Sequence, residues 1–207
     1  MTEYGFWCLE CNDLLPEAKT GRPREFCSSK CRQRNYRKRL KDAPKPGGLF
    51  PQSLRAEPRW VLYRDKRPIA PGGWWASVND QSILMTYERA RGQLDVNYVA
   101  ADGLGFVLNG DGVVCVDLDD CVEDGEPNEF AREFVSALGS TYSEFSPSGR
   151  GLHVWGYAEL DKGKVLAGEN LKVELYPAGR FITMTGNVYR DGELSSLNLS
   201  DALQLVA

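Results

Sequence analysis

The sequence of 207 residues contains no apolar run that approaches the roughly 20 residues needed to cross a bilayer. It begins without the basic and then apolar pattern of a secretion signal, and no Gly-x4-Gly-Lys-Ser/Thr motif occurs anywhere. Internal repeats and low-complexity tracts are also missing, and there is one histidine, His153. These absences predict a soluble cytoplasmic protein without a membrane partner, and they exclude a P-loop helicase or ATPase from this polypeptide.

Basic residues are concentrated near the N-terminus, although the net charge of the whole chain is -4. Ten Lys and Arg residues and one acidic residue lie between Lys19 and Lys41, whereas 15 basic and 24 acidic residues follow Lys41. Such segregation of charge predicts an N-terminal module that faces a polyanion, joined to an acidic remainder.

Four of the six cysteines form two close pairs in this N-terminal part, Cys8 with Cys11 and Cys27 with Cys31, separated by 15 residues. Two such pairs can fold over one tetrahedral Zn²⁺, and a fragment of this size lacks enough core to fold without help. The spacing therefore predicts a structural zinc site with four cysteine ligands. Two disulfides are the alternative, which a reducing cytoplasm disfavours.

A serine-capped helix stacked with cations is predicted from Ser28 onward. Its basic side chains favour contacts to phosphates that position a nucleic-acid strand without reading its sequence, and a solvated helix face is the alternative. The Pro- and Gly-containing segment that follows predicts a linker. The expected organisation is a zinc knuckle with a basic helix over 1–42, a linker over 43–58 and a larger domain over 59–207.

Strands outnumber helices in the larger domain and the two are interspersed, which predicts an α+β fold with a largely antiparallel sheet. The expected elements are a strand over 59–64, a helix capped by Asp80 and running to Leu94, hairpins over 103–119, 141–157 and 171–185, and helices over 127–138 and 200–206. The helix over 127–138 is expected to turn four side chains inward, namely Phe130, Phe134, Val135 and Leu138. Trp74 and Trp75 are expected to pack in the core, with stacking on bases as the alternative.

Carboxylates end an apolar strand at Val116-Asp117-Leu118-Asp119. Because side chains alternate along a strand, Asp117 and Asp119 lie on one face, where they repel each other unless a cation joins them. Glu174, a charge flanked by apolar residues in another expected strand, is the third carboxylate that a two-metal site requires. The alternatives are a solvated loop for the two aspartates and a water-facing strand position for Glu174.

A glycine-containing segment, Ser146-Pro147-Ser148-Gly149-Arg150-Gly151, precedes His153. Its glycines allow close approach of the backbone, and its hydroxyl groups and the Arg150 guanidinium supply hydrogen-bond donors. The segment is therefore a candidate cradle for phosphates, with His153 on the strand that follows. The alternative for a lone histidine is a satisfied core or surface position.

Taken in order, these motifs resemble those of the bifunctional primase-polymerases, members of the archaeo-eukaryotic primase superfamily that are common in phages and plasmids. The resemblance rests on four segments, 116–119, 144–153, 173–176 and 179–186, and covers roughly 59–187. It implies an RRM-like catalytic sheet with flanking helices, and Mg²⁺ or Mn²⁺ held by Asp117, Asp119 and Glu174. It also implies that His153 contacts the phosphates of the incoming nucleotide.

The function that this resemblance implies is template-directed priming or polymerisation on single-stranded DNA by two-metal nucleotidyl transfer. Ser148, Arg150 and Arg180 are the further candidates for contacts to the nucleoside triphosphate, and Arg180 has structural pairing with an acid as its alternative. A separate replicative helicase is the expected partner, in the cytoplasm of a bacterial host cell. Two other functions stay open: a metal-dependent nuclease that uses the same carboxylates, and a non-catalytic zinc-containing DNA-binding accessory of replication.

Overall fold

The computed structural model describes residues 7–16, 24–42, 50–96, 98–168 and 171–206. The chain divides into two compact units, Met1–Pro44 and Lys45–Ala207, and each is described by itself. Residues 43–49 of the expected linker lie outside the described residues. Its second half is not a free connection, because Phe50 and Leu54 are buried in the core of the larger unit, the latter on the short helix α2 (Gln52–Arg55).

One helix and a cysteine-containing loop form the described part of the smaller unit. Helix α1 (Ser29–Asp42) begins after Ser28, whose Oγ accepts a hydrogen bond from the backbone N–H of Cys31 at 3.2 Å, so the predicted serine cap is confirmed. The side chains of Lys30, Arg32, Arg34 and Lys38 are exposed on this helix. Lys38 Nζ lies 3.0 Å from Glu10 Oε1, which ties the helix to the loop between the first two cysteines.

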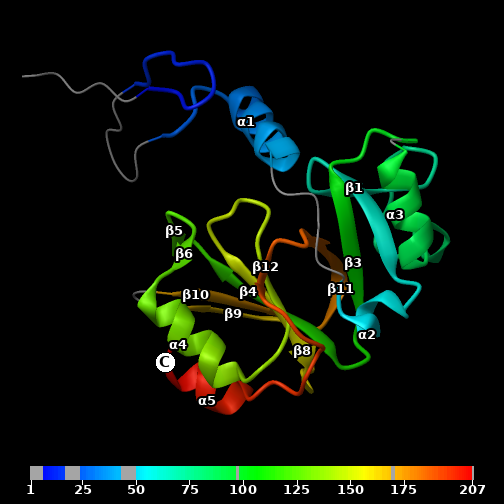
Figure 1. Ribbon diagram of the computed structural model, residues 1–207, viewed down its shortest axis with the longest axis vertical. Helices are drawn as coiled ribbons and strands as arrows, with labels where there is room; N and C mark the ends of the chain where they lie inside the picture. The colour runs from blue at the N-terminus through cyan, green and yellow to red at the C-terminus, as the bar shows by residue number, and fades with distance from the viewer. Residues whose placement is uncertain (1–6, 17–23, 43–49, 97, 169–170, 207) are drawn as a thin grey trace, which may run out of the picture. The chain divides into compact units, whose positions relative to one another are not determined.

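Two antiparallel sheets build the larger unit (Figure 1). The four-stranded sheet has the order β11 (Ala178–Met184), β3 (Gly103–Asn109), β1 (Trp60–Arg64), β2 (Arg67–Ile69). The six-stranded sheet has the order β12 (Val188–Arg190), β7 (Ser143–Phe145), β8 (Leu152–Tyr157), β4 (Val113–Asp119), β10 (Lys172–Tyr176), β9 (Lys164–Ala167). A two-stranded ribbon pairs β5 (Val122–Glu123) with β6 (Glu126–Pro127). This mixture of helices and mostly antiparallel sheet is compatible with the predicted α+β class, and the RRM-like arrangement stays a prediction.

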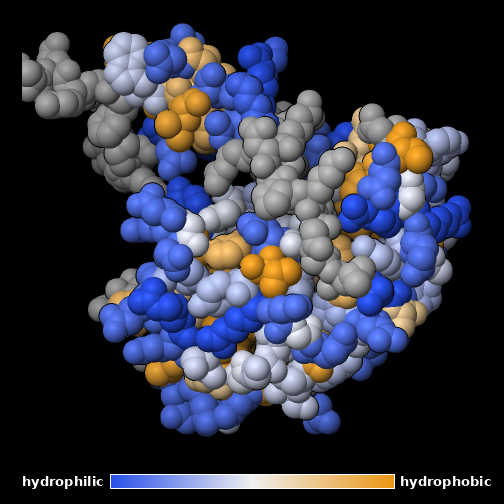
Figure 2. Space-filling model, viewed as in Figure 1, coloured by the Kyte–Doolittle hydropathy of each residue, from blue (hydrophilic) through white to orange (hydrophobic). Residues whose placement is uncertain are grey.

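Strand β4 alternates between two hydrophobic cores. Cys115 faces a core that it shares with Trp60 and Phe106 of the four-stranded sheet, whereas Val116 and Leu118 face the opposite core. The helices α4 (Glu129–Leu138) and α5 (Leu199–Gln204) cover this second face of the six-stranded sheet (Figure 1). Asp117 is in phase with Cys115, so it lies on the face that the four-stranded sheet partly covers. The surface in view is largely hydrophilic, with its hydrophobic side chains scattered in small groups (Figure 2).

Helix α4 is amphipathic, as its sequence predicts. Asn128 caps it by accepting a hydrogen bond from the backbone N–H of Ala131 at 2.9 Å, and three of the predicted inward residues, Phe134, Val135 and Leu138, are buried. The prediction for Phe130 is wrong, because its side chain is 47% exposed. Residues 131, 134, 135 and 138 form the buried stripe, and residue 130 lies about a quarter of a turn from the centre of that stripe.

Phe134→Ala is expected to lower the free energy of unfolding by about 3–5 kcal/mol, because it leaves a cavity in a fully buried site. Phe130→Ala is the matched control on the same helix, with an expected change of less than about 1 kcal/mol. Urea unfolding followed by circular dichroism measures both. Equal destabilisation by the two substitutions would contradict this assignment of the helix faces.

Two of the three expected hairpins are wrong. Strand β3 pairs with β1 and β11, whereas β4 pairs with β8 and β10, so the turn 109–112 joins strands of different sheets. Strands β10 and β11 likewise belong to different sheets. The hairpin over 141–157 is confirmed by the pairing of β7 with β8. Strands β3 and β4 are buried on both faces, so their hydrophobic pattern does not define a partner.

The expected helix from Asp80 to Leu94 is interrupted. The Asp80 carboxylate accepts a hydrogen bond from the Ser82 N–H at 2.9 Å, but the 3₁₀-helix it caps, η1, ends at Ile83. The helix α3 (Tyr87–Asp95) starts with its own cap, Thr86. Within the described ranges, every helix falls short of the length and apolar character that a membrane crossing requires.

Candidate functional site

A row of four polar side chains crosses the six-stranded sheet. The strand register places Glu144 of β7 opposite His153 of β8, His153 opposite Asp117 of β4, and Asp117 opposite Glu174 of β10. Directly opposed residues of antiparallel neighbours share a face, with their Cβ atoms about 4.5–5.5 Å apart. Four strands that are separated in sequence therefore bring three acids and the one histidine of the chain side by side.

The row lies where the core meets solvent. One step inward along the same face, Cys115 and Trp155 are fully buried. One step outward, the Asp119 side chain is 44% exposed, compared with 21% for Asp117. Asp117 and Asp119 therefore combine partial desolvation with access to solvent, a combination that strengthens their interaction with a cation.

Lys172, which sequence reasoning missed, joins two of the predicted metal ligands. Its Nζ lies 2.6 Å from Asp119 Oδ2 and 2.5 Å from Glu174 Oε1. These hydrogen bonds to Asp119 and Glu174 raise the pKa of Lys172, so the ammonium stays charged. The alternation of Lys172, Val173 and Glu174 along β10 was the available signal, because it places lysine and glutamate on one face.

Asp117 and His153 shift each other's protonation. Burial raises the pKa of Asp117; the positive charge of His153 opposes this, and the neighbouring Asp119 and Glu174 charges raise the pKa further. Burial alone lowers the pKa of His153, but Glu144 and Asp117, together with a backbone group of Thr183, outweigh it and raise the pKa. The crowding of like charge around Asp117 is the condition that a bound cation relieves.

The segment 146–151 connects β7 to β8 and folds against the end of β4. A Cβ atom on Gly151 would lie 2.4 Å from the carbonyl oxygen of Leu118, so only glycine permits this approach. Arg150 pairs with Asp120 at 3.0 Å, and the backbone N–H of Arg150 donates to Ser148 Oγ at 3.2 Å. Ser148 and Arg150 are therefore held at the end of β4 where Asp119 lies.

Arg180 approaches from the four-stranded sheet. Its guanidinium carbon lies 4.0 Å from the centroid of the Tyr176 ring, and Tyr176 follows Glu174 by two residues on the same face of β10. Among the described residues, no carboxylate lies within ion-pair distance of Arg180, so the alternative of structural pairing with an acid finds no partner there. The stacked position leaves the guanidinium donors available for another anion.

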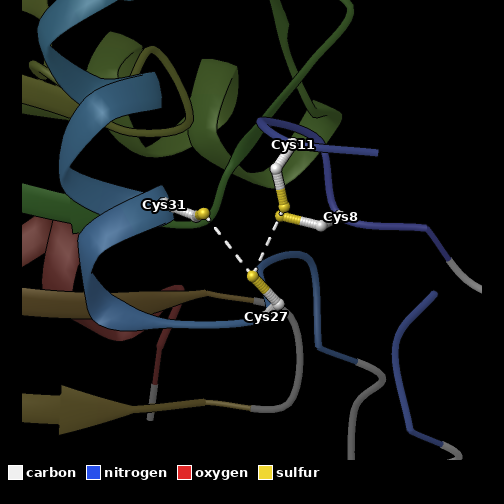
Figure 3. A group of neighbouring side chains, drawn as sticks. All are labelled: Cys8, Cys11, Cys27 and Cys31. Carbon is white, nitrogen blue, oxygen red and sulfur yellow. Dashed lines mark hydrogen bonds between the residues drawn. The ribbon is translucent and has the colours of Figure 1, made fainter. Parts of the chain in front are cut away.

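The four N-terminal cysteines gather at one point, with their sulfur atoms turned toward one another (Figure 3). All four Sγ atoms lie within 4.8 Å of one another, and Cys27 Sγ is 3.5 Å from the Sγ atoms of both Cys11 and Cys31. Desolvation raises the pKa of Cys8, but backbone N–H groups outweigh this effect and lower the pKa to about 6. The cluster can therefore hold a metal ion.

In the described part of the chain, this cluster is the one group of three or more His, Cys, Asp or Glu side chains whose ligand atoms lie so close together. The predicted ligands Asp117, Asp119 and Glu174 share a sheet face but are more widely spaced, and Lys172 lies between two of them. The structure thus brings the three carboxylates into one region with a cation already among them.

Comparison with known proteins adds one relative. The chain is 35% identical over 162 residues to a protein named DNA primase-polymerase from the Nitratiruptor phage NrS-1. This chain is a homologue of a phage primase-polymerase. The match covers 72% of this chain and 22% of the phage protein, so the chain spans about a fifth of the length of that relative. No family model matches the chain.

Glu144 is the second residue beside the predicted site that sequence reasoning missed. Its carboxylate is fully buried and accepts three hydrogen bonds, from Tyr142 Oη at 3.0 Å, Thr185 N at 3.0 Å and Gly186 N at 2.8 Å. His153 Nδ1 lies 3.7 Å from Glu144 Oε1, so Glu144 faces the side of the imidazole opposite the side that faces Asp117. Its neighbours along β7 are Ser143 and Phe145, which give no pattern of their own, so only the pairing of β7 with β8 reveals Glu144.

Glu144→Gln is expected to lower the pKa of His153, because it removes one of the two carboxylates that favour the imidazolium ion. Since the folded-state pKa is raised, the charged imidazole stabilises the native protein fully below about pH 6.5, and this stabilisation is lost as the pH rises through the folded value. The Glu144→Gln variant should lose this stabilisation at a lower pH than the unaltered protein. NMR of the single histidine in the metal-free protein measures the pKa directly. Glu123→Gln, at an exposed position, is the control, and equal titration of His153 in both variants would contradict the assignment.

Proposed function

We propose that the larger unit carries out template-directed nucleotidyl transfer as a DNA primase-polymerase. The observation that supports this most strongly is the row in which Asp117, His153 and Glu174, from three different strands, become neighbours on one sheet face. The homology to a phage protein of that name supports the same activity. The expected setting is phage or plasmid replication in the cytoplasm of a bacterial host cell.

Asp117, Asp119 and Glu174 are the proposed ligands of Mg²⁺ or Mn²⁺. All three offer carboxylate oxygens, which these hard cations prefer, and the ammonium group of Lys172 between Asp119 and Glu174 is a cation held by the same oxygens. Metal binding therefore requires Lys172 to turn away. Ions held by these three carboxylates would supply activation of the attacking 3′-hydroxyl group and stabilisation of negative charge on the departing pyrophosphate.

The remaining polar residues fit the triphosphate of the incoming nucleotide. The pKa of His153 is raised, which favours a positively charged imidazole beside Asp117 that can donate to a phosphate oxygen. Ser148 and Arg150 reach the site from the segment at the end of β4, and Arg180 reaches it from the other sheet. Glu144 holds no substrate in this proposal and orients His153.

The smaller unit is proposed to bind a structural Zn²⁺ through Cys8, Cys11, Cys27 and Cys31. The exposed basic residues of α1 would then contact the phosphates of a single-stranded DNA template. A separate replicative helicase is the proposed partner, since a single-stranded template has to be exposed by separation of the duplex.

The experiment that tests this function measures nucleotide incorporation on single-stranded DNA with Mg²⁺ or Mn²⁺, with and without an annealed primer. Products without a primer establish priming, and products only with a primer establish extension from an existing end. Labelled DNA incubated with Mn²⁺ and no nucleotides tests the nuclease alternative, since only a nuclease yields fragments. If neither synthesis products nor DNA fragments form, the alternative of a non-catalytic DNA-binding accessory would be favoured.

A further inference from the structure

Two adjacent tryptophans are exposed in the larger unit, so their expected packing in the core is wrong. The Trp74 side chain is 66% exposed and that of Trp75 is 41% exposed. Both follow β2 in a turn outside the catalytic row. Exposed neighbouring indoles are an unusual use of large apolar side chains and commonly mark an interaction surface.

The turn holds both tryptophans in fixed positions. The Ala70 N–H donates to the Trp74 carbonyl oxygen at 2.9 Å, and the Gly73 N–H donates to the Ala70 carbonyl oxygen at 2.8 Å. A Cβ atom on Gly72 would lie 1.7 Å from the Trp74 ring, so the indole rests directly on the glycine backbone. Trp75 forms a β-bridge with Ile69 at the end of β2. The rings are therefore presented by an ordered turn, which reduces the entropy lost when a partner binds.

Two guanidinium groups lie over the second tryptophan. The guanidinium carbon atoms of Arg64 and Arg67 are 4.7 Å and 4.6 Å from the centroid of the Trp75 ring, and Arg64 Nη2 donates to the Gly73 carbonyl oxygen at 3.1 Å. Neither arginine has a carboxylate within ion-pair distance in the described ranges. The connection of β1 to β2 adds Lys66 and one acid, Asp65, so aromatic faces occur beside an excess of positive charge.

We propose that this tryptophan patch, made of Trp74, Trp75, Arg64 and Arg67, binds single-stranded DNA. A base would stack on the exposed indole of Trp74, and the guanidinium groups held over Trp75 would contact the phosphates, a combination typical of binding that does not depend on sequence. The cations favour a polyanionic occupant over an uncharged protein surface. The inference rests on the proposed function, which requires a single-stranded template, and it adds a binding surface that shares no residue with the carboxylate row.

The test compares the affinity of the whole chain for a fluorescein-labelled oligothymidine, measured by fluorescence anisotropy without added nucleotide. Trp74→Ala is expected to weaken binding roughly tenfold, the effect of losing one stacked base. Arg67→Gln should weaken binding and reduce the slope of log affinity against log salt by about one. Phe130→Ala, which removes an exposed aromatic ring on α4, is the control and should bind like the unaltered protein.

An abasic oligonucleotide separates stacking from charge. The Trp74→Ala variant should bind it as the unaltered protein does, whereas Arg67→Gln should still bind it more weakly. Equal affinity of Trp74→Ala and the unaltered protein for oligothymidine would overturn the proposal. It would also be overturned if sedimentation showed that Trp74→Ala changes the oligomeric state while the affinity for DNA stays the same. Unaltered protein that binds oligothymidine through the patch but incorporates no nucleotide would overturn the proposed function and leave the patch standing.

Discussion

Asp117→Asn is expected to reduce nucleotide incorporation on a primed template by roughly a thousandfold. Metal ions contribute several kcal/mol to the stabilisation of transition-state charge, and each 1.4 kcal/mol corresponds to about a factor of ten in rate. Asp117 is central to the site because its strand lies between the strands of His153 and Glu174. Primer extension at saturating template and nucleotide measures the loss, and titration with Mn²⁺ followed by electron paramagnetic resonance should show weaker metal binding.

The matched control for this substitution is Asp124→Asn. Asp124 lies in the exposed turn between β5 and β6, away from the row of polar side chains. Its substitution by Asn removes the same charge as Asp117→Asn. Its incorporation rate should equal that of the unaltered protein, and both variants should retain their affinity for single-stranded DNA. Extension by Asp117→Asn at the normal rate would show that the metal site lies elsewhere.

Removal of zinc is expected to unfold the smaller unit and leave the larger unit folded. The described hydrophobic cluster of the smaller unit consists of Cys8, Leu15 and Cys31 with Phe26 packed against it, so metal coordination must provide most of its stability. Structural zinc contributes about 10–16 kcal/mol in peptides of this kind. Addition of a chelator should release one zinc ion per chain and collapse the amide NMR resonances of α1, while the resonances of the two large sheets stay dispersed.

Cys27→Ser should have the same effect as the chelator, because Cys27 is the sulfur that contacts two of the others. Cys121→Ser is the matched control. Cys121 is buried in the larger unit, with its Sγ 3.5 Å from the Leu118 carbonyl oxygen, a contact that a serine hydroxyl can reproduce. A full complement of zinc in Cys27→Ser would rule out the four-cysteine site, and loss of zinc in Cys121→Ser would place the metal elsewhere.

Local patterns in the sequence were sufficient for part of the site. Alternation along one strand predicts that Asp117 and Asp119 share a face, and the spacing of the cysteine pairs predicts the cluster around Cys27. Neither pattern predicts which strands pair or which residues lie opposite each other in the sheet. That Asp117 lies opposite both His153 and Glu174 depends on which strands pair, and the sheet assignment of β3 and β4 shows that neighbours in sequence need not pair.

Residues that act through a partner were harder to find. Lys172 is an ordinary exposed strand lysine until the register places it beside Asp119. Glu144 looks like a solvent-facing strand acid, and its complete burial follows from hydrogen bonds to Thr185 and Gly186, which lie far along the chain. The exposure of Trp74 was not predicted because a large apolar side chain is usually buried. The turn at Gly72 holds this indole at the surface instead.

The central position of β4 also has a consequence for the order of events during folding. Its two partners, β8 and β10, arrive from later parts of the chain, and each supplies one neighbour of Asp117. A partly folded chain that has docked β8 alone contains Asp117 and Asp119 but lacks Glu174, the third proposed ligand. The three proposed ligands therefore come together only once β10, from a late part of the chain, has paired with β4.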